Sequence, residues 1–389
     1  MSLSFSASAY EEQGDRPEME DAHVVQTLMT AKEHGMQVEL FAVFDGHVTA
    51  HVSKYLCHTF PVVLKRNLLA SLQIEAFENA IRQSFVECNA AILARVDNKP
   101  GAEKDGFQEF CDGNEVFHKG GSTAVVALLV NANWLFVANC GDSEAILLSS
   151  SAVNDEKQEA IAAVEKNKRE WAEKTSNDEK KASRLVEFDK TVPALGDKKS
   201  LLCLSKLHKP QLEVERIQKA GSYVHRGRIN DMLSVSRSFG DFDFSAVIVD
   251  PHISKTRVAV GDTFILACDG LWDVFSYEEA MRAAIHFGQP GNSENTVSQS
   301  LVESAIYERR SLDNVTAIVV SIGKDQEDVC EQSKSASASS TTAPKTAPSQ
   351  RGFRQCHDCS QIVPKSSYSK SQWAKRPVSA SRCQSCVAK

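Results

Sequence analysis

Short apolar runs that stop at an acidic residue recur along this chain. Residues 40–44 read Leu-Phe-Ala-Val-Phe and are followed at once by Asp45, Gly46 and His47. A short apolar run of this kind predicts a buried strand. A carboxylate at the end of such a strand needs compensation, the glycine permits close approach to the backbone, and the histidine can carry a proton near neutral pH. Taken alone, the run favours a strand that ends in an ordinary turn.

The same pattern appears three more times, which changes that judgement. Apolar runs lead into Asp269 and into Asp142, and Asp313 precedes another such run. Strands of one sheet assembly can bring these acids together, but converging carboxylates repel each other unless a cation joins them. Sites made of oxygen ligands suit Mg²⁺ or Mn²⁺. The sequence therefore predicts a metal site formed by aspartates at strand ends.

Apolar periodicity predicts the other elements. Side chains at helical spacing predict helices, which fall within residues 49–96, 212–220, 277–286 and 297–308. Apolar runs bounded by turn residues predict a hairpin of 124–130 with 134–139, a hairpin within 258–269 that turns at Gly261 and Asp262, and a final strand at 315–322. Residues 151–200 are rich in Glu, Lys and Ala and predict an exposed insertion, to which we assign no chemistry.

Composition and charge narrow the classes of protein. The chain has 389 residues, 42% of them hydrophobic, so it can bury a sizeable core. Its net charge of −7 argues against general affinity for nucleic acids or membrane surfaces. No apolar run is long enough to cross a bilayer, the N-terminus shows no secretory signal, and Ser2 excludes N-myristoylation. We therefore expect no membrane partner and no nucleic-acid partner.

The eleven cysteines fall into two groups. Seven are scattered without paired spacing, and four lie together near the C-terminus. This distribution is typical of a reducing compartment with free thiols and one metal cluster. We expect the protein in the cytoplasm, the nucleus or both.

Seven short motifs, taken in order, resemble those of the metal-dependent type 2C protein serine/threonine phosphatases. They are Arg16-x-x-Met19-Glu20-Asp21-x-His23, Asp45-Gly46-His47, Gly121-Ser122-Thr123, Asn139-Cys140-Gly141-Asp142-Ser143, Ser236-Arg237-x-x-Gly240-Asp241, 267–273 (Ala-Cys-Asp-Gly-Leu-Trp-Asp) and Asp313-Asn314-Val315-Thr316. The resemblance covers about residues 8–323 and implies an α+β fold, an α-β-β-α sandwich of two antiparallel sheets flanked by helices. It places the catalytic domain at residues 1–323, with 151–200 as the charged insertion.

The resemblance also implies which residues bind the two Mg²⁺ or Mn²⁺ ions. Asp45 would bridge the two ions, and Asp269 and Asp313 would complete the protein ligands of the first. The Gly46 carbonyl would bind the second ion, and Glu20 would act on it through water. The remaining acids are expected to orient those waters or to hold a third, weaker ion, and they are Asp21 for the waters and Asp142 and Asp273, with Asp269, for the third ion.

For catalysis, the resemblance implies attack by water on phosphorus without a covalent enzyme intermediate. Arg16 would hold the phosphate oxygens with its planar fork of donors. His47 would protonate the departing serine or threonine oxygen of a phosphorylated protein substrate. We expect a monomer.

Four places depart from the family's usual pattern. After Asp45-Gly46-His47 the family usually has small residues and glycine, whereas Val48-Thr49-Ala50-His51 follows here, which affects the expected start of the next helix and not the metal ligands. Glu144 stands where the family usually has arginine, Asn230-Asp231 replaces a usual Asn-Gly turn, and residues 205–210 lack the common acid. We expect these last three in or near the surface that meets substrate, so substrate preference could be unusual. A non-catalytic relative that binds phosphorylated ligands without turnover remains an alternative, against which the complete set of metal ligands and His47 argue.

The C-terminal part predicts a separate small module. Residues 324–350 are rich in Ser, Ala, Thr and Lys and predict a flexible linker. Two Cys-x-x-Cys pairs follow, Cys356 with Cys359 and Cys383 with Cys386, and such pairs fit a tetrahedral structural zinc site. We therefore predict a zinc-ribbon-like module at 351–389, with a reduced, metal-free tail as the alternative. Its basic residues suit docking to a partner protein or RNA, and we favour a protein.

Overall fold

The computed structural model describes residues 3–96, 120–149, 200–291 and 294–324, and the backbone of 353–355 and 362–364. The chain divides into two compact units, Met1–Gln326 and Glu327–Lys389. The first contains two five-stranded sheets whose neighbouring strands all pair antiparallel. One sheet has the order β1 (Leu3–Glu12), β15 (Val315–Lys324), β14 (Thr263–Ala267), β8 (Glu144–Ser149), β9 (Ser200–Cys203). The other has the order β13 (His252–Arg257), β7 (Trp134–Cys140), β6 (Ala124–Val130), β3 (Val38–Phe44), β2 (Ala22–Met29).

The two sheets pack face to face through an apolar layer. β3 is buried at all seven positions because both of its faces are covered, and this explains its unbroken apolar sequence. Side chains alternate between the faces of a strand, so Phe41 and Val43 enter the layer between the sheets. There Phe41 meets Phe264 of β14 edge-on, with ring centroids 5.7 Å apart. The antiparallel sheets that the family resemblance implies are confirmed.

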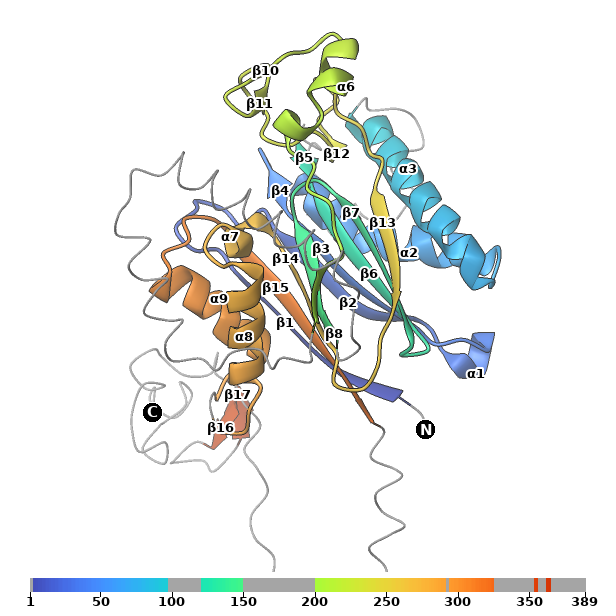
Figure 1. Ribbon diagram of the computed structural model, residues 1–389, viewed down its shortest axis with the longest axis vertical. Helices are drawn as coiled ribbons and strands as arrows, with labels where there is room; N and C mark the ends of the chain where they lie inside the picture. Colours follow the sequence, from blue (N-terminus) through green and yellow to red (C-terminus); the bar gives the residue numbers. More distant parts are fainter. Residues whose placement is uncertain are drawn as a thin grey trace, which may run out of the picture. The chain divides into compact units, whose positions relative to one another are not determined.

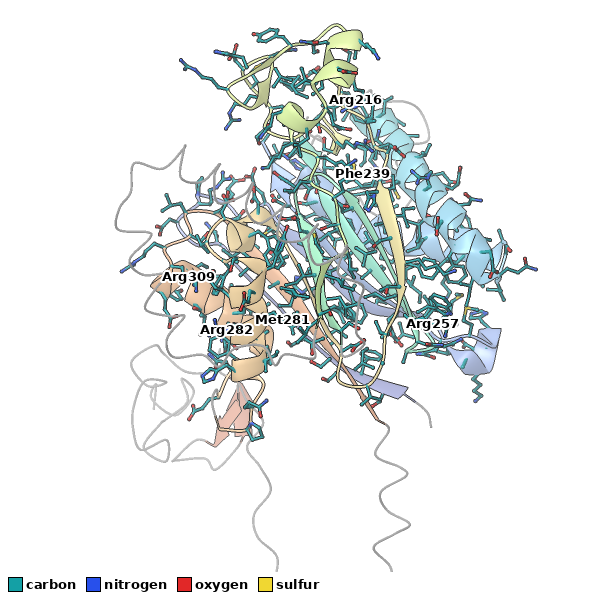
Figure 2. The ribbon with its side chains drawn as sticks, in the orientation of Figure 1. Arg216, Phe239, Arg257, Met281, Arg282 and Arg309 are labelled. Atoms are coloured by element: carbon teal, nitrogen blue, oxygen red, sulfur yellow. The ribbon has the colours of Figure 1, made fainter. Side chains whose placement is uncertain are left out.

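Helices cover the outer face of each sheet (Figure 1). α2 (His51–Leu69) and α3 (Phe77–Val96) pack on the sheet that contains β3, where Phe60 of α2 contacts Phe44 with centroids 5.9 Å apart. α8 (Tyr277–Phe287) and α9 (Val297–Glu303) cover the other sheet. Met281 of α8, labelled in Figure 2, is fully buried there. The helices predicted within these ranges are confirmed.

Shorter elements complete the first unit. They are α1 (Ala31–His34), α6 (Val214–Lys219), α7 (Asp269–Trp272), the 3₁₀ turns Ile74–Ala76 and Pro210–Leu212, the π-helical turn Ser304–Glu308, a small sheet of β12 (Phe239–Gly240), β5 (Gly121–Ser122) and β4 (Gly46–His47), and the ribbon β10 (Val224–His225) with β11 (Arg228–Ile229). α6 and the β10–β11 ribbon share a small apolar cluster of their own. No helix in the described ranges has the length and apolar character needed to span a bilayer.

One predicted hairpin forms and another does not. β6 and β7 pair across a turn in which Asn131 and Ala132 have φ of 50° and 49°, as tight hairpins require. The predicted hairpin within 258–269 is wrong, because β13 pairs with β7 in one sheet while β14 pairs with β15 and β8 in the other. Gly261 does turn the chain, with φ of 90°, but the turn carries it from one sheet to the other.

Several sequence predictions fall outside the described residues. The charged insertion except Ser200 lies in the undescribed residues 150–199, and the linker except Lys324 lies in the undescribed residues 325–352. The four tail cysteines, Cys356, Cys359, Cys383 and Cys386, are not described either. In the second unit, β16 (Phe353–Gln355) pairs antiparallel with β17 (Ile362–Pro364).

Candidate active site

Three aspartates from different strands meet at one end of the two sheets. Asp45 follows β3, Asp142 lies between β7 and β8, and Asp269 begins α7 directly after β14. One carboxylate oxygen from each lies within 4.8 Å of the others. The strands are fixed by ladders of backbone hydrogen bonds, so the carboxylates are held close despite their mutual repulsion. The convergence predicted from the strand-end pattern is present for these three residues.

The carboxylates of this cluster are only partly neutralised by positive charge. Burial raises the pKa of Asp45 well above its ordinary value, and the neighbouring acids, led by Asp21, raise it further. Burial also raises the pKa of Asp269, as do Asp142 and Asp273, while Lys209 opposes them. Buried carboxylates with little neutralisation and only oxygen donors fit a hard divalent cation such as Mg²⁺ or Mn²⁺.

Lys209 supplies part of the missing charge. Its ammonium group makes an ion pair with Asp142. Burial lowers the pKa of Lys209, but Asp142 and then Asp269 outweigh burial and raise it, so the lysine stays protonated. Lys209 is not among the residues predicted for the site, because it lies 67 residues from Asp142 and no spacing links the two.

Asp21 lies on the other side of Asp45. Oxygen atoms of Asp21 and Asp45 and the sulfur of Cys268 form a second group within 4.8 Å. Burial raises the pKa of Asp21 to about 6, although the Thr316 hydroxyl, which donates to Asp21 Oδ2 at 2.6 Å, lowers it. Burial and the nearby acids raise the pKa of the Cys268 thiol well above its ordinary value. Cys268 therefore stays a neutral thiol, and a bound cation would find its charged ligands among the carboxylates.

Arg16 forms a bidentate ion pair with the carboxylate of Asp313. Arg16 Nε and Nη2 lie 2.8 and 3.0 Å from the two carboxylate oxygens of Asp313, and Arg16 Nη1 lies 3.9 Å from Glu20. The hydrogen bonds that Arg16 donates to Asp313 raise the pKa of Arg16. Asp313 is therefore not in the tight carboxylate groups, yet it is close enough for its charge to raise the pKa of Asp45.

Two residues shape the loop that carries Arg16 and Glu20. The Asn314 amide donates to the carbonyls of Gln13 and Glu18 at 2.8 and 3.0 Å and accepts from the Glu20 N–H at 2.9 Å. On the other side, a Cβ on Gly46 would lie 2.3 Å from the Glu20 carbonyl oxygen. Only glycine fits there, in agreement with the close approach predicted from the sequence.

His47 is held by an acid that spacing could not identify. His47 Nε2 lies 2.7 Å from Asp241 Oδ2, and Ser238 Oγ donates to the same oxygen at 2.5 Å. Burial lowers the pKa of His47, but Asp241 outweighs burial, and Asp142 and Glu20 add to its effect, so the pKa is raised. The imidazolium form is favoured, which suits a proton donor. The two residues are 194 positions apart, and the only sequence signal was the motif that contains Asp241.

Comparison with known proteins decides the family. Residues 5–166 and 194–315 match the model of the family described as protein phosphatase 2C. The chain belongs to this family. It is a metal-dependent serine/threonine protein phosphatase.

Curated relatives agree with this assignment, and solved structures share the fold. The integrin-linked kinase-associated serine/threonine phosphatase 2C of Bos taurus is 31% identical over 346 residues, which is 83% of this chain and 78% of the relative. Protein phosphatase 1A of Mus musculus is 28% identical, over 79% of this chain and 68% of the relative. A serine-threonine phosphatase 2C from Toxoplasma gondii superposes with a TM-score of 0.54 at 21% identity, covering 82% of this chain and 95% of that one. A C. elegans sex determining protein gives 0.57 at 20% identity, over 84% and 67%. These structures share the fold.

The departures from the family pattern have different environments in this phosphatase. Glu144 is only 1% exposed and accepts a hydrogen bond from the Tyr277 hydroxyl, so the expectation that it lies at a substrate-facing surface is wrong. A β-strand buried on both faces places it there, between the sheet and α8. Asn230, which is half-buried, and Asp231, which is exposed, form a turn with φ of 52° and 63°. The Tyr223 hydroxyl donates to Asp231 at 2.8 Å.

The remaining predicted residue, Asp273, lies at the end of α7. Its backbone N–H donates to the Asp269 carbonyl at 2.7 Å, and its charge raises the pKa of Asp269. It is therefore close to the cluster, but its carboxylate is not in the two groups within 4.8 Å.

Proposed function

We propose that this phosphatase hydrolyses phosphoserine and phosphothreonine in proteins by direct attack of water, at a centre that holds two Mg²⁺ or Mn²⁺ ions. The observation that carries the proposal is the convergence of the Asp45, Asp142 and Asp269 carboxylates in a buried site. Two such ions, when bound, supply Lewis acidity and lower the pKa of water. Burial and repulsion between the acids raise the pKa values of Asp45 and Asp269. A divalent cation bound here would offset that repulsion.

We assign the ligands from the residues that surround this cluster. Asp45 would bridge the two ions, with Asp269 and Asp313 on the first. The Gly46 carbonyl and, through water, Glu20 would serve the second. The other acids would orient water or hold a third ion, and they are Asp21, Asp142 and Asp273.

Arg16 and His47 would act on the substrate. The planar fork of Arg16 binds the two oxygens of Asp313 here, and the same geometry fits two oxygens of a phosphate. In the imidazolium form, His47 Nε2–H donates to Asp241. The Nδ1 proton is then left for transfer to the departing serine or threonine oxygen. That oxygen leaves poorly as an alkoxide, so protonation by His47 would contribute about 10²–10⁴-fold to the rate.

The packing supports the family's α-β-β-α sandwich as the full architecture of the catalytic domain. One apolar cluster lies between the sheets, and one lies between each sheet and its helices. In this arrangement the loops at one end of both sheets carry the catalytic residues.

The test is a phosphothreonine-peptide assay with Mn²⁺. We expect activity that EDTA abolishes and that Asp45→Asn removes, because the amide keeps the shape but not the charge of the bridging ligand. Glu78→Gln, at an exposed carboxylate of α3, is the matched control and should retain full activity. Normal turnover by Asp45→Asn would refute the metal centre.

We propose separately that Cys356, Cys359, Cys383 and Cys386 bind one structural zinc ion. The two Cys-x-x-Cys pairs support this, as does the antiparallel pairing of β16 with β17, which bracket the first pair in sequence. The basic module would dock a partner protein, and we propose a monomer in the cytoplasm or nucleus. Elemental analysis should find about one zinc per chain, lost on truncation after residue 350. Cys383→Ala should lose it and Cys330→Ala should not; a zinc-free full-length protein would refute the module.

A further inference from the structure

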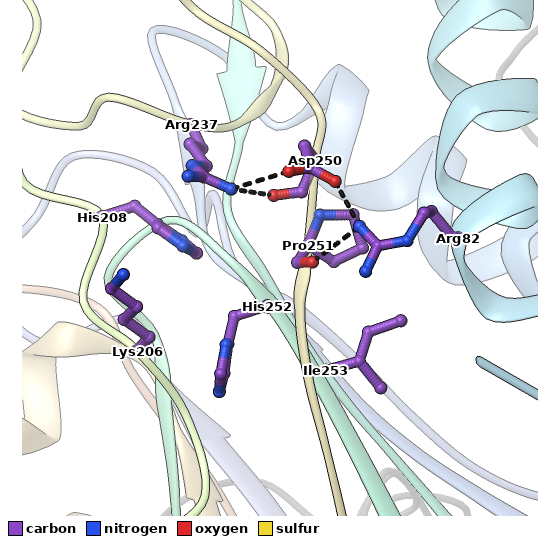
Figure 3. Close-up of a pocket in the computed structure, with 8 residues that line it drawn as sticks. All are labelled: Arg82, Lys206, His208, Arg237, Asp250, Pro251, His252 and Ile253. Carbon is purple, nitrogen blue, oxygen red and sulfur yellow. Dashed lines mark hydrogen bonds and ion pairs between the residues drawn. The ribbon is translucent and has the colours of Figure 1, made fainter. Parts of the chain in front are cut away.

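A basic pocket lies beside the first residues of β13, separate from the carboxylate cluster. Its volume is about 260 Å³. Six charged or imidazole side chains line it together with Pro251 and Ile253, as Figure 3 shows, and they are Arg82, Lys206, His208, Arg237, Asp250 and His252. They come from α3, from the segment after β9, from the segment before β12, and from the start of β13 and the residues just before it. A pocket so polar suits a small charged ligand rather than an apolar one.

His208 places an unsatisfied donor in this pocket. The residue is 1% exposed. Its Nδ1 accepts the N–H of Gly141 at 3.2 Å, so in the neutral ring the proton is on Nε2. Nε2 is buried and has no hydrogen-bond partner among the described residues. Buried N–H groups are nearly always paired in native structures, so the pocket requires an acceptor at this atom.

Two lining arginines, Arg82 and Arg237, already have acidic partners within the protein. Arg82 forms an ion pair with Asp250, and Arg237 Nη1 donates to the Asp250 carboxylate at 3.1 Å, as the dashed lines in Figure 3 show. The other donors of Arg237 bind Glu213. Both arginines are therefore engaged, and Asp250, the lining acid, is neutralised by them.

Lys206 and the two imidazoles remain. Lys206 is exposed, His252 is half-buried, and neither side chain has a hydrogen bond or ion pair in the part of the chain that is described. Three lining cations and one acid give a net charge of about +2 with neutral imidazoles. The nearby positive charges also affect the histidines. Burial and then Arg237 lower the pKa of His208 to about 4, and burial and then Lys206 lower the pKa of His252.

We propose that this pocket is a second binding site, for a phosphate-type oxyanion, in which Lys206, the His208 Nε2–H and His252 contact the oxygens. An oxyanion supplies the acceptor that His208 lacks and the negative charge that Lys206 and the two arginines attract. The ligand is either free inorganic phosphate or a phosphate group on a protein, such as a second phosphorylated residue of a substrate. The site does not depend on the metal centre or on turnover, although it adjoins that centre through Gly141, which precedes Asp142.

The binding test uses the chelator-treated full-length chain with Arg16→Ala, which removes the arginine proposed to bind phosphate at the catalytic centre. Inorganic phosphate is titrated while imidazole ¹H–¹⁵N spectra are recorded. We expect saturable shifts of the His208 and His252 signals, competition by sulfate, and none by chloride. Lys206→Gln should weaken binding about tenfold, the order of one charge-assisted hydrogen bond, whereas Lys219→Gln, an equally exposed lysine on α6, should leave it unchanged.

Two changes at His208 separate its two nitrogens. Asn can place an acceptor near the position of Nδ1 but has no group at Nε2, so His208→Asn should lose phosphate affinity while keeping the Gly141 contact. Gln can place its amide donor near Nε2, so His208→Gln should bind phosphate more tightly than His208→Asn. If these buried variants do not fold, Lys206→Gln and His252→Gln decide the matter.

A second arm distinguishes the sources of the oxyanion. In the same non-catalytic background, a doubly phosphorylated peptide is compared with its singly phosphorylated partner. A preference for the doubly phosphorylated peptide that Lys206→Gln abolishes assigns the pocket to a protein-borne phosphate, and equal affinities assign it to free phosphate. The proposal is overturned if phosphate does not bind saturably. It is also overturned if Lys206→Gln and His252→Gln both bind phosphate as tightly as the Arg16→Ala protein without them. Neither result bears on catalysis, which the manganese assay tests independently.

Discussion

Replacement of Lys209 by methionine removes the cation that pairs with the buried carboxylate of Asp142 while keeping most of the side-chain volume. The Asp142 side chain is 3% exposed and that of Lys209 is 24% exposed. The positive charge also acts on Asp269, whose pKa it lowers against burial and neighbouring acids. We therefore expect Lys209→Met to destabilise the fold when divalent ions are withheld.

The size of this effect follows from the burial of the pair. Removing one partner of a buried ion pair costs about 3–5 kcal/mol, because the other charge is left uncompensated. Partial exposure of Lys209 puts this case at the lower end, about 3 kcal/mol. In a domain of this size 1 kcal/mol shifts the melting temperature by roughly 2 °C, so we expect a loss of about 6 °C.

The pH and the metal should each change this loss in a defined direction. Because the pKa values of Asp45 and Asp269 are raised in the fold, their ionisation opposes folding as the pH rises. The destabilisation by Lys209→Met should therefore be larger at pH 8 than at pH 6. Saturating Mn²⁺ brings its own positive charge and stabilises the folded state by mass action, so it should raise the melting temperature of the variant more than that of the wild type.

Calorimetry in EDTA and in Mn²⁺, at both pH values, measures these differences. Lys219→Met, at an exposed position of α6, controls for the loss of one lysine and should melt with the wild type. Equal melting of Lys209→Met and wild type in EDTA would show that the ion pair does not neutralise the cluster. An equal loss with and without Mn²⁺ would show that Lys209 and a divalent cation do not act on the same carboxylates.

Three further changes test other parts of the site. His47→Gln should lower kcat about 10²–10⁴-fold on a phosphothreonine peptide but far less on an aryl phosphate, whose leaving group needs no proton; equal losses on both would contradict its role as an acid. Gly121→Ala should cut peptide turnover, because the new Cβ would lie 2.2 Å from Asp241 Oδ2 and 2.3 Å from the His47 ring, while Gly35→Ala, at a site with open space but φ of 71°, should cost stability without affecting kcat. Burial raises the pKa of Glu213, but hydrogen bonds led by Arg237 bring it to about 2, so Glu213→Gln should lose about 2 kcal/mol at pH 7 in urea unfolding, and the deficit should shrink as the pH falls below about 4.5.

The strand ends were predictable because the information is local. An apolar run that stops at an acid fixes both the strand and the direction in which the acid lies, and Asp45 and Asp269 follow this rule. The unbroken apolar run of β3 likewise indicated that both faces of the strand are buried. The partners of these acids could not be read in this way, since Lys209 and Asp241 reach the site from loops of unrelated spacing.

The error at residues 258–269 has the same origin. Gly261 and Asp262 do form a turn, in which Asp262 Oδ2 accepts the Ala259 N–H at 2.9 Å. A turn determines where the chain reverses, but pairing depends on which strand edges are free. The partners of β14 on both sides are β15 and β8, so β13 found its partner in β7 instead. Long-range pairing of this kind leaves no mark in a short window of sequence.

The charges of the site divide into a rigid set and an adjustable set. The aspartates stand at the ends of strands whose ladders fix them, whereas the two balancing cations come from loops: Arg16 precedes β2 with its side chain 43% exposed, and Lys209 follows β9. A divalent ion attracts the acids and repels both cations. Because the aspartates cannot move far, the change on ion binding should fall on Arg16 and Lys209. Arg16 would then leave the Asp313 carboxylate and bind a phosphate of the substrate. Metal binding and substrate binding would in this way be coupled through one side chain.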